Sequence, residues 1–430
     1  MPPNPTSEPS IDGSLHHYMK KRVLAAACTT LVLWGCAAPA PTEIPVAPPF
    51  ATATVAVEHE QRFARWVRDF SSTARAAGIS DATLSLAFSG VRYMPRVIAA
   101  DRAQPEFARA VWDYLDTAVS AQRIAAGQKK LQQLQTQIEP VAAGYGVPAE
   151  VLVAIWGMES SYGSFTGDIP TVDALASLGF EGRREAWARS QLLAALRILQ
   201  SGDIPREQML GSWAGAMGQT QFLPTSFLAH AVDADGDGRR DIWGSVPDVM
   251  ASTANFLVQS GWQTGQHWGA ELRLPPDFDY ARADDAVRQP TTAWRSEGLQ
   301  SVDGSPLPEM PDASVLLPAG ARGPAFLVGP NFRTILRYNN STSYALAVHL
   351  LAQRLGNGPA VQAAWPRGTP VLTRTQLLAL QTALNARGFD SGTPDGMMGP
   401  ATQRGIRRFQ RSLALPADGY PSADLLQRLQ

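Results

Sequence analysis

Residues 148–163 read PAEVLVAIWGMESSYG and form the most informative stretch of the chain. Pro148 suits the first turn of a helix, and Gly163 can end one. Between them, apolar residues recur at helical spacing and share one face: Leu152, Ile155 and Trp156. The stretch therefore predicts a core helix of a mainly helical domain.

Glu159 lies on the apolar face of this helix, four residues after Ile155 and three after Trp156. A carboxyl group held against apolar groups loses solvation, so its pKa rises and it can carry a proton at neutral pH. A general acid for a glycosidic oxygen needs this property. The alternative is an ion pair between Glu159 and an arginine inside the core.

Two further motifs follow in order. Residues 211–226 read GSWAGAMGQTQFLPTS, and residues 331–339 read NFRTILRYN, followed by Ser343 and Tyr344. With AIWGMESSYG at 154–163, they resemble the membrane-bound lytic murein transglycosylase B family. The resemblance implies a mainly α, lysozyme-like core with a small β region (α+β), and a groove for alternating N-acetylglucosamine (GlcNAc) and N-acetylmuramic acid (MurNAc).

The resemblance also implies the site. Glu159 matches the family's catalytic acid/base, and the substrate-binding residues are Ser212, Gln221, Tyr338, Asn339 and Tyr344. We expect Tyr338 to hydrogen-bond the reacting centre or the catalytic carboxylate. A simpler interpretation of Gly215, Gly218 and Gln219 is a tight turn that displays Gln221. Phe256 departs from the family, which commonly has Tyr there, so a groove hydroxyl is missing.

Only one carboxylate is placed by these motifs, whereas ordinary glycosidases use two. Asp168 and Asp173 follow closely, but Asp173 is better interpreted as a capping or structural residue. One carboxylate suffices if the MurNAc C6 hydroxyl attacks C1 and gives a 1,6-anhydro sugar. The sequence thus predicts a peptidoglycan lytic transglycosylase that needs no cofactor for chemistry. The alternatives are a hydrolytic muramidase and a non-catalytic peptidoglycan-binding lipoprotein.

Composition excludes several other classes. The chain has 37 basic and 38 acidic residues without a long run of one sign, so a nucleic-acid surface is not expected. The two cysteines, Cys28 and Cys36, lie near the start, which excludes disulfides and Cys nucleophiles from the globular part. The six histidines show no zinc-ligand spacing. We expect a monomer that binds peptidoglycan glycan strands.

The first 36 residues have the pattern of a lipoprotein leader. Three basic residues, 20–22, precede an apolar run at 23–34 that is too short to span a bilayer. The run ends in Leu-Trp-Gly-Cys36, which resembles a lipobox although Trp34 is bulkier than usual there; the true start could be Met19. We expect lipidation at Cys36, an Ala/Pro-rich tether at 37–57, and a periplasmic, outer-membrane-anchored protein. The alternative is a soluble periplasmic protein cleaved nearby.

The expected catalytic domain, 58–355, is mainly helical, with short strands and loops at about 265–330. Within it, Asp233, Asp235 and Asp237 have the alternate spacing of a calcium-binding EF-hand loop. The backbone carbonyl of Arg239 and the carboxylate of Asp248 would complete the ligands, because position 12 is a glycine. Either the loop holds a structural calcium, or it is an Asp/Gly turn without metal.

Residues 371–430 form a separate unit with three predicted helices, which carry the apolar residues Leu377, Leu380 and Leu384, then Ile406 and Phe409, then Leu425, Leu426 and Leu429. Asp395-Gly396 and Asp418-Gly419 mark turns. The unit resembles the three-helix peptidoglycan-binding domain of wall hydrolases. The alternative is a small helical cap without a ligand.

Overall fold

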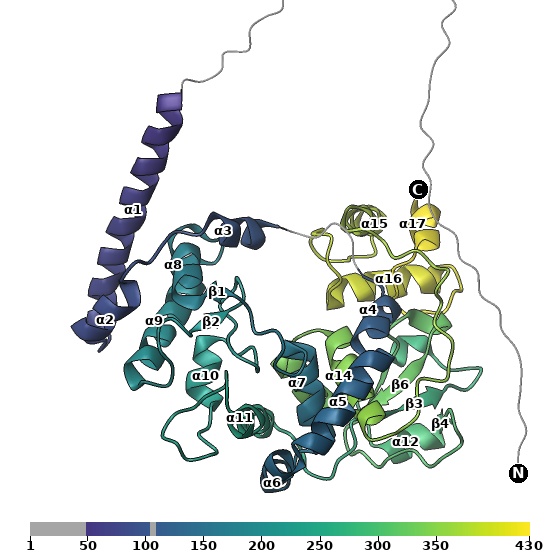
Figure 1. Cartoon of the computed structure of the whole chain (residues 1–430). Helices are drawn as coiled ribbons and strands as arrows, with labels where there is room; N and C mark the ends of the chain where they lie inside the picture. Colours follow the sequence, from purple (N-terminus) through teal and green to yellow (C-terminus); the bar gives the residue numbers. More distant parts are fainter. Residues whose placement is uncertain (1–48, 104–108) are drawn as a thin grey trace, which may run out of the picture. The chain divides into compact units, whose positions relative to one another are not determined.

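The computed structural model of the protein describes residues 49–103 and 109–430 (Figure 1). The expected leader, with Cys36, and the expected tether as far as residue 48 lie outside these residues. Helix α1 (Pro49–Ala76) begins within the segment 37–57, so residues 49–57 are helical and not the extended tether predicted from composition. Later turns of the same helix bury Phe63, Val67 and Phe70, which favours its formation. Residues 55–430 form one compact unit.

One group of helices surrounds a first apolar core, which includes Phe63, Ile98, Leu175, Leu192 and Phe227. Besides α1, its helices are α2 (Asp81–Phe88), α3 (Pro95–Arg102), α8 (Thr171–Glu181), α9 (Glu185–Ser201) and α10 (Pro224–His230). The two-residue strands β1 (Ile169–Pro170) and β2 (Leu210–Gly211) pair antiparallel beside it.

A second apolar core forms around α7 (Ala149–Ser160), whose residues 151–157 are all buried. The surrounding helices are α4 (Val111–Ala118), α5 (Ala121–Gln133), α6 (Gln135–Tyr145), α11 (Val246–Gln259), α13 (Pro330–Tyr338) and α14 (Thr342–Leu355). A helix that is buried on every side is a core helix, which explains why α7 is apolar beyond the single predicted stripe. Phe256 and Tyr338 contact both cores.

The β region is a four-stranded antiparallel sheet in the order β4-β3-β6-β5. Its strands are β3 (Gly269–Arg273), β4 (Gln300–Ser301), β5 (Ser314–Leu316) and β6 (Ala325–Val328). The short helices η1 (Tyr280–Arg282), α12 (Thr291–Ser296) and η2 (Gly320–Arg322) connect them around the buried Trp294. The predicted mainly helical fold with a small β region is confirmed.

The C-terminal helices α15 (Arg374–Ala386), α16 (Pro400–Ser412) and α17 (Ala423–Leu429) have a core of their own. The predicted apolar residues of all three helices meet in it, so the three-helix unit is confirmed. Arg407 of α16 nevertheless forms an ion pair with Asp284 of the β region, and the backbone N–H of Ala321 donates to Asp418.

No single helix among the described residues is long and apolar enough to cross a membrane. Helices α6 and α7 reach that length and hydropathy only as a pair, bent by 112° between them.

Candidate active site

Glu159 occupies the last turn of α7, just before the chain leaves the helix. Ser161 and Tyr162 adopt left-handed backbone conformations and Gly163 follows with φ +82°, so the helix stops immediately after Ser160. The Glu159 side chain is partly buried, and burial raises the pKa of its carboxyl group to about 7. Among the described residues it forms no ion pair, and the nearby Arg123 donates to the Gly157 carbonyl instead. The environment is therefore the apolar one predicted from the helix pattern.

Tyr344, the third residue of α14, supplies a hydrogen bond to this carboxyl group. Its hydroxyl donates to Glu159 Oε1 across 2.5 Å, and the ring is buried. Figure 1 shows α14 beside α7, which brings these two residues together across a long stretch of sequence. The hydrogen bond favours the ionised carboxylate and opposes part of the effect of burial on the pKa of Glu159.

Tyr338 lies near the same carboxylate, whose charge contributes to raising the pKa of this phenol well above its ordinary value, after burial. Its hydroxyl donates to the Thr220 carbonyl across 2.7 Å, so the expected hydrogen bond to the catalytic carboxylate comes from Tyr344 in its place. The Tyr338 ring contacts Phe256, with the ring centroids 4.8 Å apart. Position 256 thus contributes an aromatic contact to this group but no hydroxyl.

The motif at 211–226 folds into a tight turn that faces the end of α7. Ser212 Oγ accepts hydrogen bonds from the N–H groups of Ala214 and Ala216, so this hydroxyl holds the turn. Gln221 has a left-handed backbone, and its side-chain amide donates to the carbonyls of Thr166 and Gly218. The motif therefore forms the predicted tight turn, and this turn holds Gln221 in place.

Gln219 has a structural role that was not predicted from the sequence. It is buried, accepts a hydrogen bond from Trp156 Nε1 at 2.8 Å and donates to the Trp243 carbonyl at 2.6 Å. A Cβ atom on Gly163 would lie 2.4 Å from Gln219 Oε1, so only glycine allows this approach. Gln219 thereby joins α7 to the turn. Its signal in the sequence was a polar residue directly after the run 213–218, which consists of small and apolar residues.

Tyr114 of α4 is a second residue that sequence reasoning missed. Its pKa is raised by burial first and then by the negative charge of Glu159, which places the phenol within electrostatic range of the carboxylate. No motif surrounds Tyr114 in the sequence, so no local signal identified it.

The remaining predicted residues are dispersed. Asn339 is exposed where α13 ends. Asp168 is exposed, and Asp173 is buried within the first turn of α8, where it accepts the backbone N–H of Arg92 and pairs with Arg206. Asp173 is therefore structural, as expected, although it holds neighbouring elements together and does not cap its own helix.

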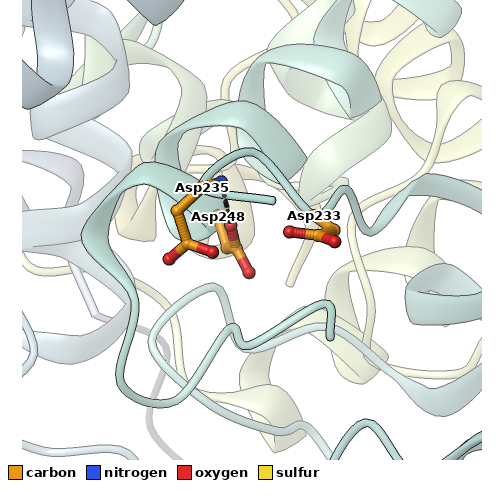
Figure 2. Close-up of side chains that lie close together, drawn as sticks. All are labelled: Asp233, Asp235 and Asp248. Carbon is orange, nitrogen blue, oxygen red and sulfur yellow. Dashed lines mark hydrogen bonds between the residues drawn. The ribbon is translucent and has the colours of Figure 1, made fainter. Parts of the chain in front are cut away.

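Of the predicted calcium ligands, the structure brings three together. Carboxylate oxygens of Asp233, Asp235 and Asp248 lie within 4.8 Å of one another. Figure 2 shows these side chains and the hydrogen bond from the backbone N–H of Asp235 to Asp248. Burial raises the pKa of Asp248, as expected for a carboxyl group surrounded by protein and by another acidic group. Asp237 lies outside this group and binds Arg239.

Comparison with known proteins agrees with this geometry. The model of the transglycosylase SLT domain family matches residues 62–353, and that of a putative peptidoglycan binding domain matches residues 373–429. Membrane-bound lytic murein transglycosylase B of Escherichia coli K12 is 36% identical over 216 residues, which cover 49% of this chain. The matched region spans 57% of that relative's length.

Two solved structures are also similar. SltB3 from Pseudomonas aeruginosa, in complex with NAG-anhNAM-pentapeptide, is 52% identical with a TM-score of 0.84, over 85% of this chain and 99% of that one. The Escherichia coli lytic transglycosylase Slt35 in complex with calcium is 28% identical with a TM-score of 0.58, over 69% of this chain and 93% of that one. The family model covers more than half of the sequence and includes Glu159 and the turn that faces it, and the chain therefore belongs to the transglycosylase SLT domain family.

Proposed function

We propose that this protein is a lytic murein transglycosylase that cleaves the MurNAc–GlcNAc β-1,4 bond of peptidoglycan without water and leaves 1,6-anhydro-MurNAc ends. The observation that carries the proposal is Glu159, a carboxyl group with a pKa raised to about 7 and a hydrogen bond from Tyr344. Such a group can donate a proton and later accept one near neutral pH. The anhydro sugar named in the SltB3 complex supports the same reaction class.

In the first step, protonated Glu159 gives its proton to the glycosidic oxygen, and the C1–O bond of MurNAc breaks. The GlcNAc unit leaves with a new hydroxyl group. In the second step, the Glu159 carboxylate takes the proton from the MurNAc C6 hydroxyl while O6 bonds to C1. The nucleophile belongs to the substrate, so it has the proximity advantage that a free water molecule lacks.

The residues around Glu159 orient its carboxylate and position the substrate. Tyr344 keeps the carboxylate oriented, and Tyr338 forms an aromatic wall with Phe256. We assign sugar contacts to Gln221 and to the exposed Asn339. The Gln221 amide fixes the loop, and its side-chain oxygen accepts no hydrogen bond from the residues that the structure describes, so it can accept one from a sugar. Ser212 contributes by fixing the shape of its turn.

A hydrolytic muramidase is the competing function, and it requires a second carboxylate to activate water. Of the two candidates in the sequence, Asp168 is exposed to solvent, and Asp173 is committed to Arg206 and to the Arg92 backbone. This commitment favours the non-hydrolytic reaction.

The decisive experiment is mass spectrometry of muropeptides released from purified peptidoglycan by the protein and by Glu159→Gln. We expect anhydro products from the unaltered protein and almost none from the variant. Products one water heavier would establish a hydrolase. No products from either protein would favour a non-catalytic wall-binding protein.

We also propose that the loop at 233–248 binds calcium as a structural ion. The donor set of three neighbouring carboxylates is of the oxygen type that calcium prefers, and one of them is buried at the base of the loop. Calcium in the Slt35 structure supports the assignment. Added calcium should raise the melting temperature of the protein but not that of Asp248→Asn, while magnesium should have a smaller effect. Equal melting curves with and without calcium would contradict the site.

The proposal extends to the location of the protein in the cell and to its attachment to peptidoglycan and to the membrane. We propose that residues 371–430 bind peptidoglycan, and that a lipid on Cys36 anchors a monomeric enzyme to the outer membrane from the periplasmic side. Metabolic labelling with a palmitate analogue should label the protein and not Cys36→Ala, and labelling of both would place the lipid elsewhere.

A further inference from the structure

Phe165 is the most exposed large apolar side chain among the described residues. Its exposed fraction is 70%, and the others in this class are aliphatic or methionine side chains. Single exposed apolar residues are common on protein surfaces and need no special explanation. Phe165 differs because of where its backbone is held.

The loop that carries Phe165 is fixed on the side of the catalytic helix. The backbone N–H of Phe165 donates to the carbonyl of Ser160 at 2.9 Å, and Ser160 directly follows Glu159. On Gly163, a Cβ atom would lie 2.4 Å from Gln219 Oε1. The segment therefore folds back against the end of α7, next to the acid/base.

The same loop is fixed on the side of the turn at 211–221. The carbonyl of Thr166 accepts the side-chain amide of Gln221 at 3.0 Å. A Cβ atom on Gly167 would lie 2.1 Å from the carbonyl oxygen of Gly211. These contacts leave the backbone little freedom to carry Phe165 into the core, so its side chain stays exposed on a loop whose backbone is held next to Ser160 and Gln221.

We propose that Phe165 is a substrate-contact residue whose phenyl ring stacks on the apolar face of a sugar ring in the glycan strand, next to the bond that Glu159 breaks. This inference rests on the proposed function. A phenyl ring has no hydrogen-bonding group, so it recognises the C–H face of a pyranose and not its hydroxyl pattern. Exposure in the free protein leaves its apolar area available for burial by the substrate.

Such a contact strengthens the binding of substrate and transition state alike, so its loss raises KM and leaves kcat nearly unchanged. A structural role predicts a different result. Because the side chain is exposed, its truncation costs little stability, and the melting temperature separates the two roles.

The experiment compares Phe165→Ala with Phe165→Trp and with Leu86→Ala. Leu86 is 49% exposed and lies in α2, outside the loops that approach Glu159, so it is the matched control for loss of an exposed apolar side chain. With soluble peptidoglycan strands, we expect Phe165→Ala to raise KM about fivefold to tenfold, with kcat within twofold. Phe165→Trp and Leu86→Ala should keep the original KM, and all melting temperatures should agree.

A binding measurement tests which part of the substrate is contacted. In the Glu159→Gln background, Phe165→Ala should weaken binding of glycan strands stripped of stem peptides by about the same factor. An unchanged KM in Phe165→Ala, a weakening seen only with strands that keep their peptides, or no binding of stripped strands would each overturn the proposal. Failure of the unaltered protein to release anhydro products would instead overturn the proposed function, so the two failures are distinguishable.

Discussion

Tyr344 donates its hydroxyl to Glu159 Oε1 across 2.5 Å, and it is the one hydrogen-bond donor to this carboxylate among the described residues. Two effects therefore oppose each other at Glu159. Burial favours the protonated acid, and the phenol favours the carboxylate, with a resulting pKa of about 7. A group that must first donate a proton and then accept one benefits from this balance.

The first prediction concerns Tyr344→Phe. Loss of the hydrogen bond removes the effect that lowers the pKa of Glu159, so the pKa rises further. Because the first step requires the protonated acid, the alkaline limb of the pH–rate profile should move to higher pH. We expect kcat to fall roughly tenfold, since the carboxylate is less well oriented. The measurement is the release of anhydro-muropeptides between pH 5 and 9.

Tyr338→Phe is the matched control for this variant. It also removes one phenol hydroxyl close to Glu159, but that hydroxyl donates to the Thr220 carbonyl. The alkaline limb should stay in place. Equal shifts in both variants would show that Tyr344 has no specific effect on the carboxylate.

The second prediction concerns the stability cost of Glu159. Its folded pKa of about 7 lies above the ordinary value of 4.5, so the folded state holds the proton more tightly. The contribution of Glu159 to the free energy of unfolding is therefore fully present below pH 4.5 and is lost as the pH rises through 7. Glu159→Gln should therefore be more stable than the unaltered protein at pH 8, by about 3 kcal/mol, and the difference should nearly disappear at pH 4.5. Urea unfolding at both pH values measures it, and a constant difference would contradict the raised pKa.

Local patterns in the sequence predicted local structure well. The helix around Glu159, the apolar surroundings of its carboxyl group and the three C-terminal helices all follow from residue spacing within one element. Contacts between distant elements were not predictable in this way. The Tyr344 hydrogen bond, the position of Tyr114 and the bridging role of Gln219 depend on how separate helices and turns meet.

Composition did not correctly predict the secondary structure of residues 49–57, near the start of the chain. Residues 49–57 belong to an Ala- and Thr-containing segment that predicts an extended tether, yet they continue the helix that buries Phe63 and Phe70. Packing of the later turns of α1 outweighs the weak preference of residues 49–57 for an extended chain. A helix propagates from a stable turn at little cost.

The third prediction tests the role of Asp173. Asp173→Asn weakens the pairing with Arg206, a mostly buried side chain, and should destabilise the fold by about 3 kcal/mol. The products should remain anhydro sugars, because this carboxylate takes no part in the chemistry. Product analysis at a temperature well below unfolding checks this. Loss of activity in a folded variant would instead indicate a second catalytic carboxylate.

The fourth prediction concerns His349, which is buried in α14 and stacked on Trp268 with ring centroids 5.0 Å apart. Burial lowers its pKa from 6.5 to about 3, against a smaller opposing effect of the Asn331 backbone. In the unfolded chain the imidazole takes up a proton below pH 6.5, and in the folded protein it does not. Stability from this group is therefore fully present above pH 6.5 and is lost as pH falls toward 3, by up to about 1.4 kcal/mol per pH unit.

His349→Leu should remove this acid sensitivity, because leucine fills a similar volume and does not titrate. Urea unfolding at pH 7 and pH 4.5 measures the change in free energy of unfolding between the two conditions, and the change should be smaller in the variant. His267→Leu is the control for replacement of an exposed histidine by leucine. An unaltered pH dependence in His349→Leu would show that carboxyl groups elsewhere govern acid unfolding.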